Sequence, residues 1–173
     1  QNSQDGVWRQ IDESALEQQR PEAAARFADP LFYKAFRLNK AALGDVLERA
    51  PREFSYAARN TETVLTLPLP DGAFARFRIE NSPIMEPALA AEYPEIQSFR
   101  GQGIDNPAAS ARFDFSPNGF RAMIFTGYGT TILVEPSAKG DTLNYISFYK
   151  NDAKRSSGEW ACEVGGEILS QQP

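Results

Sequence analysis

The chain of 173 residues contains no histidine and only one cysteine, Cys162. Without histidine, the chain cannot form a Ser–His or Cys–His nucleophilic pair, and it cannot form a zinc site of the HExxH type. A single cysteine excludes an internal disulfide and a metal site made of several thiolates. An enzyme made from this chain would therefore depend on carboxylates, lysine or tyrosine for its chemistry.

Basic residues are also in short supply. The chain has 18 Lys and Arg residues against 23 Asp and Glu residues, which gives a formal net charge of −5. Nucleic acids and anionic membranes require a clustered basic surface, so the charge balance predicts that neither is the main partner. No apolar run approaches the roughly 20 residues of a membrane span, and we expect no membrane insertion.

The length and the hydrophobic content of 42% predict one globular domain of ordinary size. We expect a polar helical segment over residues 1–30 and a β-rich core over residues 31–152. Residues 153–173 are polar and poor in periodicity, which is typical of a linker or tail leading towards a further domain.

Helices are expected in the N-terminal third. Asp12 is a suitable N-cap for a helix over residues 13–20, and Asn39 is one for a helix over residues 40–50. The second helix carries a stripe of apolar residues at the spacing of one buried face: Leu43, Val46, Leu47 and Ala50. Residues 31–38 between the helices are expected to form a strand with three residues on one face: Phe32, Phe36 and Leu38.

From residue 63 on, apolar and polar residues alternate between turn signals. The pattern predicts three hairpins, which are 63–69 with 73–80, 111–115 with 120–126, and 130–135 with 142–150. A short helix is expected over residues 88–92, and Gly101, Gly103 and Pro107 indicate loop or strand-edge structure around Ile104. The fold class is therefore α+β, predominantly antiparallel β, as a sandwich or a curled sheet.

Four segments of the β-rich part resemble a known family. They are TLPLPDG at 66–72, SPIMEPALAAEYPEIQSFRGQGIDNP at 82–107, FDFSPNGFRAMI at 113–124 and KGDTLNYISFYKND at 139–152. Together they resemble the N-terminal pro-domain of secreted bacterial zinc metallopeptidases of the reprolysin-like (metzincin) kind. The resemblance covers residues 32–152, and the long block at 82–107 is its most specific part.

The resemblance implies that the chain is the non-catalytic part of a metallopeptidase precursor. In such proteins a signal peptide precedes the pro-domain, and a catalytic domain with the HExxHxxGxxH motif follows it. The implied protein is secreted, its signal peptide is removed, and its partner is the cognate catalytic domain. No cofactor is implied in this chain, since the zinc belongs to the catalytic domain. The implied role is to assist folding of that domain and to keep it latent until cleavage.

Cys162 is the one candidate metal ligand. In related pro-domains, a lone cysteine near the C-terminal end supplies a thiolate to the catalytic zinc. A thiolate about 2.3 Å from such a zinc displaces the water that acts as nucleophile. The other interpretation is a small apolar residue at the edge of the fold. The family places glycine directly after this cysteine, whereas Glu163 follows Cys162 here, and a neighbouring carboxylate disfavours a metal-free thiolate.

Carboxylates supply two further candidates, each with a simpler interpretation. Glu86, Glu92 and Glu95 lie around a proline-framed segment and could form an acid/base pair of the glycosidase type, although a solvated loop and helix face explains them. Asp105 and Asp141 could ligate calcium, but no EF-hand or aspartate-rich repeat surrounds them. Both aspartates are suitable turn residues.

Two other patterns do not indicate a ligand. Gly101-Gln102-Gly103 lacks the third glycine and the strand–turn–helix context of a nucleotide loop. Arginines interleave with phenylalanines at Arg76, Arg78, Arg112 and Arg121, and at Phe74, Phe77, Phe113 and Phe120. This pattern suits either a nucleic-acid platform or the polar face of an amphipathic sheet, and the net charge favours the sheet.

The alternative function is a non-catalytic carbohydrate-binding or adhesion β-sandwich module of a secreted protein. Aromatic side chains on an exposed sheet face would suit such a module. Trp8 and Trp160, however, lie outside the predicted strands, and most aromatic residues within the strands are expected to face inward. Under either function the chain is not itself an enzyme, and no catalytic residue is predicted in it.

Overall fold

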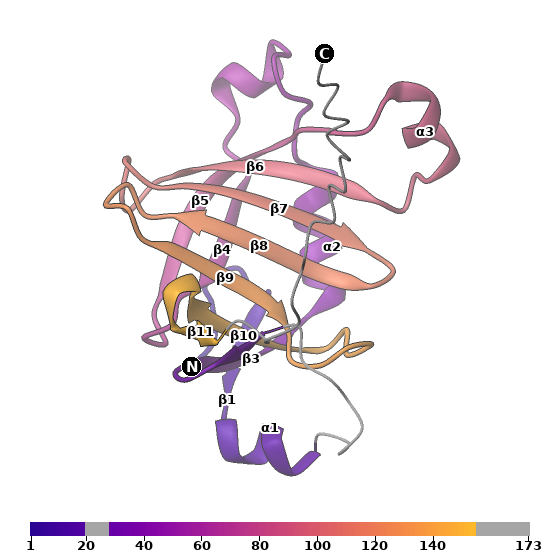
Figure 1. Cartoon of the computed structure of the whole chain (residues 1–173). Coiled ribbons are helices and arrows are strands. Elements are labelled where there is room, and N and C mark those ends of the chain that lie inside the picture. The colour runs from indigo at the N-terminus through magenta and orange to yellow at the C-terminus, as the bar shows by residue number, and fades with distance from the viewer. Residues whose placement is uncertain (20–27, 155–173) are drawn as a thin grey trace, which may run out of the picture.

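A single curled antiparallel sheet dominates the fold. The computed structural model describes residues 1–19 and 28–154. Nine strands follow the order β1-β3-β10-β9-β8-β7-β6-β5-β4, and a separate two-stranded sheet joins β2 to β11 (Figure 1). This confirms the predicted fold class, α+β with predominantly antiparallel β, and its curled-sheet form.

The strands of the large sheet are β1 (Trp8–Ile11), β3 (Lys34–Leu38), β10 (Asn144–Tyr149), β9 (Thr131–Pro136), β8 (Gly119–Phe125), β7 (Ser110–Ser116), β6 (Gln97–Gly103), β5 (Phe74–Asn81) and β4 (Val64–Pro68). The small sheet pairs β2 (Asp29–Pro30) with β11 (Ala153–Lys154). The helices are α1 (Glu13–Gln19), α2 (Lys40–Glu48) and α3 (Pro87–Glu92), with short 3-10 turns η1 (Ala57–Asn60) and η2 (Lys150–Asp152). No helix in the described ranges is long and apolar enough to cross a membrane.

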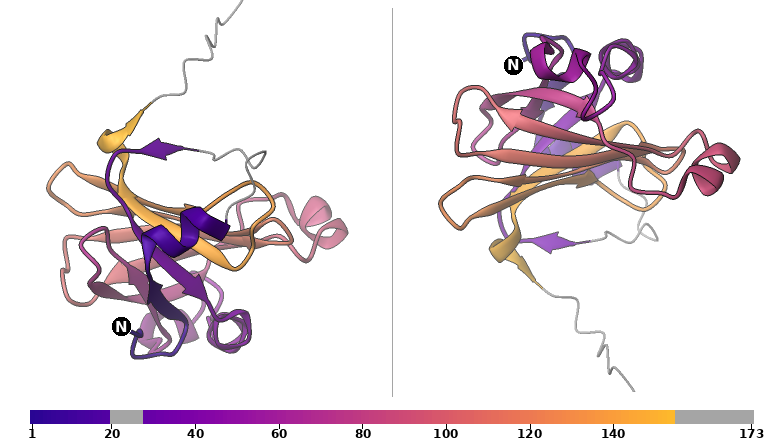
Figure 2. Two further views of the ribbon diagram at one scale, coloured as in Figure 1. Left: turned by 90° about the horizontal axis from the view of Figure 1, so that it is seen from below. Right: turned by 90° about the horizontal axis from the view of Figure 1, so that it is seen from above.

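The sheet curls until its two edge strands approach each other (Figures 1 and 2). The carboxylate of Asp5, just before β1, accepts a hydrogen bond of 2.7 Å from the backbone N–H of Thr66 in β4. Across the inside, the hydroxyl of Ser147 in β10 donates to the carbonyl of Pro68 at 2.9 Å. Both bonds satisfy backbone groups of the edge strand β4 from the other side of the curl, so the sheet nearly closes on itself.

The inner face of the sheet encloses the main core. Trp8 is 1% exposed and packs edge-on against Phe120 and Tyr145, with ring centroids 5.4 and 5.3 Å apart. The apolar stripe of α2 joins the same cluster through Leu43, Val46 and Leu47. Asn39 caps α2 as predicted, since its side-chain oxygen accepts from the N–H of Ala42. Burial of these aromatic and aliphatic groups is the main stabilising term of the fold.

Helix α1 covers part of the outer face of the sheet. Its Leu16 packs on Ala35, Ile146 and Phe148, which point outward from β3 and β10. Asp12 caps this helix as predicted, because its carboxylate accepts from the N–H of Ala15 at 3.0 Å. A second, smaller core therefore lies under α1, on the side of the sheet opposite the main core.

The three predicted hairpins are confirmed. Strand β4 pairs with β5, β7 with β8, and β9 with β10, all antiparallel. The short helix predicted over residues 88–92 is also present as α3. The alternation of apolar and polar residues predicted these strands correctly, because each strand has one face in the core.

Two expectations about local structure are wrong. Residues 8–11, within the segment expected to be helical, form β1, because Trp8 is needed in the core. Phe32 is 75% exposed and lies outside β3. Gly101 and Gly103 lie in β6, between β5 and β7, and the loop predicted around Ile104 directly follows this strand. The absence of a side chain suits this strand, since a Cβ on Gly101 would stand 3.0 Å from Cβ of Phe77.

Candidate functional site

The outer face of β6–β9 carries a hollow of about 370 Å³. In Figure 1 these four strands lie side by side towards the viewer, and no described helix lies over them. We call this surface the outer-face site. It is lined by outward-pointing residues of the four strands together with Ile84: Ser98, Arg112, Asp114, Arg121, Met123, Phe125, Leu133 and Glu135.

Charged and apolar side chains alternate across the outer-face site. Asp114 in β7 stands directly opposite Arg121 in β8, and Met123 stands opposite Leu133 in β9. Burial raises the pKa of Asp114 and of Glu135, and the nearby Arg121 opposes this rise. Surrounding residues therefore withdraw the two carboxyl groups partly from water, although no described helix lies over this face of the sheet.

A polar network fixes one border of the site. Arg100 pairs with Glu80 at 2.7 Å and lies 3.5 Å from Glu53. The Ser82 hydroxyl donates to Glu53 at 2.8 Å and accepts from Arg112 at 3.0 Å. The network holds the loop before η1 against β5, β6 and β7, so the border of the site is rigid.

Phe54 stands on this border in an unusual conformation. Its φ of 62° lies in the left-handed region, where it is the one non-glycine residue among those described. Its side chain is 81% exposed, and the guanidinium carbon of Arg100 lies 5.0 Å from the ring centroid. A bulky residue in this region is strained by roughly 1–2 kcal/mol. Such strain on an exposed aromatic ring points to a role outside the folding of this chain.

The segment between β5 and β6 adds exposed apolar side chains. It contains α3, which has no buried residue and projects beyond the ends of the strands (Figures 1 and 2). Ile84 is 78% exposed, and Leu89, Tyr93 and Ile96 are exposed as well. Exposed apolar groups beside partly buried charges are typical of a surface that binds another macromolecule.

The three glutamates around α3 show no sign of an acid/base pair. Glu86, Glu92 and Glu95 are all exposed. They agree with the simpler interpretation, a solvated loop and helix face.

The two candidate calcium ligands serve turns. Asp105 accepts from the backbone and the guanidinium of Arg76, and the side-chain hydrogen bond lowers the pKa of Asp105. Burial of Asp141 works to raise its pKa, but hydrogen bonds from Asn144, Leu143 and Ser137 outweigh it and lower the pKa. Within the described ranges, no group of three or more His, Cys, Asp or Glu side chains is placed to hold a metal.

The arginine–phenylalanine pattern is the face alternation of a sheet. Phe77, Phe113 and Phe120 are buried, while Arg76, Arg78 and Arg112 are exposed on the opposite face. Gly101-Gln102-Gly103 lies within β6. Trp8 is enclosed in the core and cannot stack on a sugar from the surface.

Cys162, Glu163 and Trp160 lie outside the described residues, so the zinc-ligand role of Cys162 stays a prediction. Phe54 and the network around Arg100 were missed at the sequence level, because a left-handed backbone at a phenylalanine has no local signal. Ile84 did have a signal in the sequence, since it lies in the block at 82–107 that carries the family resemblance.

Comparisons of the chain with protein-family models, with curated proteins and with solved structures gave no match.

Proposed function

We propose that this chain is the pro-domain of a secreted zinc metallopeptidase, and that it binds its catalytic domain through the outer-face site. The supporting observation is the exposed side chain of Ile84, which lines that site together with the partly buried Asp114 and Glu135. The exposed ring of Phe54 lies against Arg100 of the adjoining polar network. Phe54 is held there at an energetic cost that no contact within the described chain explains, apart from Arg100. A partner that covers these side chains would remove about 25 cal/mol of unfavourable hydration for each Å² of apolar surface.

The family resemblance supports the same surface. Its most specific block, 82–107, contains Ile84, the whole of α3 and the whole of β6. Few of these residues serve the core, since in this block only Ser82 and three residues of β6 are buried, namely Phe99, Gly101 and Gly103. A most specific block whose side chains are mostly exposed is consistent with a shared binding surface.

Latency in this proposal has two contributions. The bound pro-domain blocks the catalytic cleft sterically, and Cys162 donates its thiolate to the catalytic zinc in place of water. Because the thiol is tethered, its effective concentration is on the order of millimolar, so a modest intrinsic affinity suffices. Cleavage of the linker ends the tethering and releases the thiol by dilution.

The test uses the full precursor, encoded by the open reading frame that contains this chain. A downstream HExxHxxGxxH segment is expected, and a polysaccharide-degrading or adhesin module in its place would favour the alternative function. In the precursor, Ile84→Asp and Cys162→Ser should each speed autoactivation, measured as release of peptidase activity over time. Leu31→Asp is the control, because Leu31 is exposed but lies outside the outer-face site. Unchanged latency in both variants would refute the proposal.

A further inference from the structure

The two carboxylates of the outer-face site share one arginine. Asp114 in β7 stands directly opposite Arg121 in β8. The pairing of Ala122 with Val134, continued by one residue, brings Arg121 opposite Glu135 in β9. Arg121 therefore lies between two acidic side chains in one row across the sheet, and with both acids ionised the row has one negative charge in excess.

The neighbours of this row do not cancel the excess. Beyond the two carboxylates the row continues to Ser98 in β6 and to Ile146 in β10, neither of which carries a charge. Arg112, the other cation that lines the hollow, donates to the Ser82 hydroxyl at 3.0 Å within the border network. Burial raises the pKa of both carboxyl groups although Arg121 attracts them. The site therefore holds half-buried negative charge that the described chain balances only in part.

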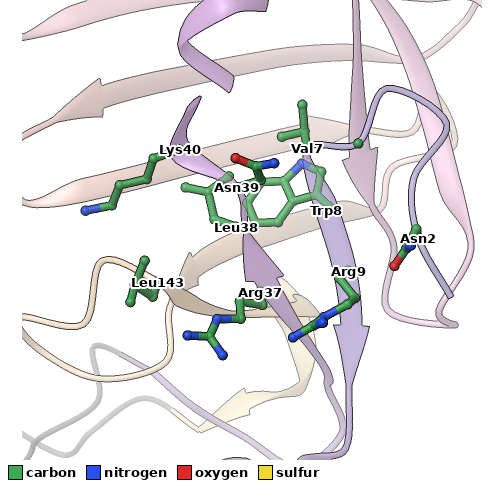
Figure 3. A pocket seen from close by; sticks show the side chains of 10 residues that line it. Asn2, Val7, Trp8, Arg9, Arg37, Leu38, Asn39, Lys40 and Leu143 are labelled. Atoms are coloured by element: carbon green, nitrogen blue, oxygen red, sulfur yellow. The ribbon is translucent and has the colours of Figure 1, made fainter. Parts of the chain in front are cut away.

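Accessible apolar side chains surround this charge. Ile84 and Phe125 line the same hollow and are 78% and 42% exposed. A second hollow, of about 460 Å³, lies between β1, β3 and the start of α2 and is built differently (Figure 3). Its arginines, Arg9 and Arg37, are exposed, and most of its apolar lining, Trp8 included, belongs to the core. Half-buried charge beside accessible apolar groups therefore distinguishes the outer-face site from that hydrated hollow.

We propose, on the basis of the function proposed above, that the catalytic domain places one basic side chain, a lysine or an arginine, against Asp114 and Glu135. Such a cation neutralises the excess charge of the row. Apolar groups of the partner on Ile84 and Phe125 exclude water from the contact, which strengthens the ion pairs. An acidic group of the partner would instead add a third negative charge to the row.

The effect of these carboxylates on the isolated chain supports a role in binding. A half-buried carboxyl group whose pKa is raised opposes folding while it is ionised. Groups that cost stability in the free protein are common where function requires them. Asp114→Asn and Glu135→Gln keep the shape of each side chain and remove its charge, so they should weaken the complex while the isolated chain melts at the same or a higher temperature.

The test uses the full precursor, with autoactivation followed as release of peptidase activity over time. Asp114→Asn and Glu135→Gln should each speed autoactivation by about tenfold, because each leaves the partner cation short of a counter-charge. Glu62→Gln is the matched control, since Glu62 is exposed and lies outside the hollow. Sodium chloride at about 0.5 M should speed autoactivation of the unmodified precursor and should have less effect on the double variant, because salt screens ion pairs.

The outcomes separate this proposal from the proposed function. If Ile84→Asp speeds autoactivation while both charge variants behave like the Glu62→Gln control, the basic partner group is overturned and the proposed function stands. Slower autoactivation in the charge variants would indicate an acidic partner group and would also overturn the proposal. Unchanged latency in all of these variants and in Cys162→Ser would refute the proposed function and the basic partner group together.

Discussion

Two parts of the same outer sheet face differ in what covers them. Over β3 and β10, the outward residues Ala35, Ile146 and Phe148 form an apolar patch, and Leu16 of α1 packs on it. Over β6–β9, charged residues such as Arg112 and Asp114 alternate with Met123, and no described element lies on them. The first composition requires a permanent cover, while the second tolerates water and can exchange it for a partner. The difference indicates which part of the face serves folding and which part serves binding.

The largest contrast is expected from two isoleucines. Ile146→Ala under α1 should lower the free energy of unfolding by about 2–5 kcal/mol, because the residue is 1% exposed and a cavity remains. Ile84→Ala in the outer-face site should change it by no more than about 0.5 kcal/mol. Urea denaturation of both variants measures the difference. Equal losses would mean that Ile84 contributes to folding and would break the comparison.

Asp141 and Asp114 should also differ in their effect on the stability of the fold, and the larger effect is expected at Asp141. Hydrogen bonds to Asp141 lower its pKa below the unfolded value of 3.8, so its ionised form stabilises the fold above that pH. The stabilisation is lost as the pH falls through the folded pKa. Asp141→Asn should therefore cost about 1–3 kcal/mol at pH 7 and progressively less below pH 3.8. A loss that is the same at pH 7 and at pH 3 would contradict the assignment.

Phe54 gives a smaller effect that separates strain from contact. Glycine adopts the left-handed conformation without strain, whereas alanine does not. Phe54→Gly should therefore be more stable than Phe54→Ala by about 0.5–1 kcal/mol, after allowing for the extra freedom of unfolded glycine. Thermal and urea denaturation of the pair measures this difference. If the alanine variant were the more stable, Phe54 would not be strained.

The smallest expected effect is at Asp114. Burial raises its pKa above the unfolded 3.8, so the ionised form opposes folding at neutral pH, and this cost disappears as the pH falls below the unfolded value. Asp114→Asn should thus slightly stabilise the chain at pH 7 and have no effect at pH 3. A pH series of melting temperatures checks this sign, which is opposite to that of Asp141. Destabilisation at pH 7 would show that Asp114 has a structural role.

The hairpins and α2 were predictable because their signals are local. Alternation fixes the faces of β4–β5 and β7–β8, and the i, i+3, i+4, i+7 stripe fixes the buried face of α2. Strand β1 was not predictable, since its pairing with β3 and the burial of Trp8 depend on contacts distant in sequence. The outer-face site was only partly predictable. Sequence resemblance indicated the block around Ile84, but the strained backbone of Phe54 and the opposition of Asp114 to Arg121 follow from tertiary structure.

The central claim is that the outer face of β6–β9, over which no described helix lies, binds the catalytic domain together with the adjoining α3 segment. Hydrogen–deuterium exchange can compare the isolated 173-residue chain with the intact, latent precursor. We predict slower exchange in the precursor over residues 83–96, which carry α3 and Ile84, with little change in α1, which the fold already packs against the sheet. Identical exchange of residues 83–96 in the two proteins, with the precursor fully latent, would contradict the claim.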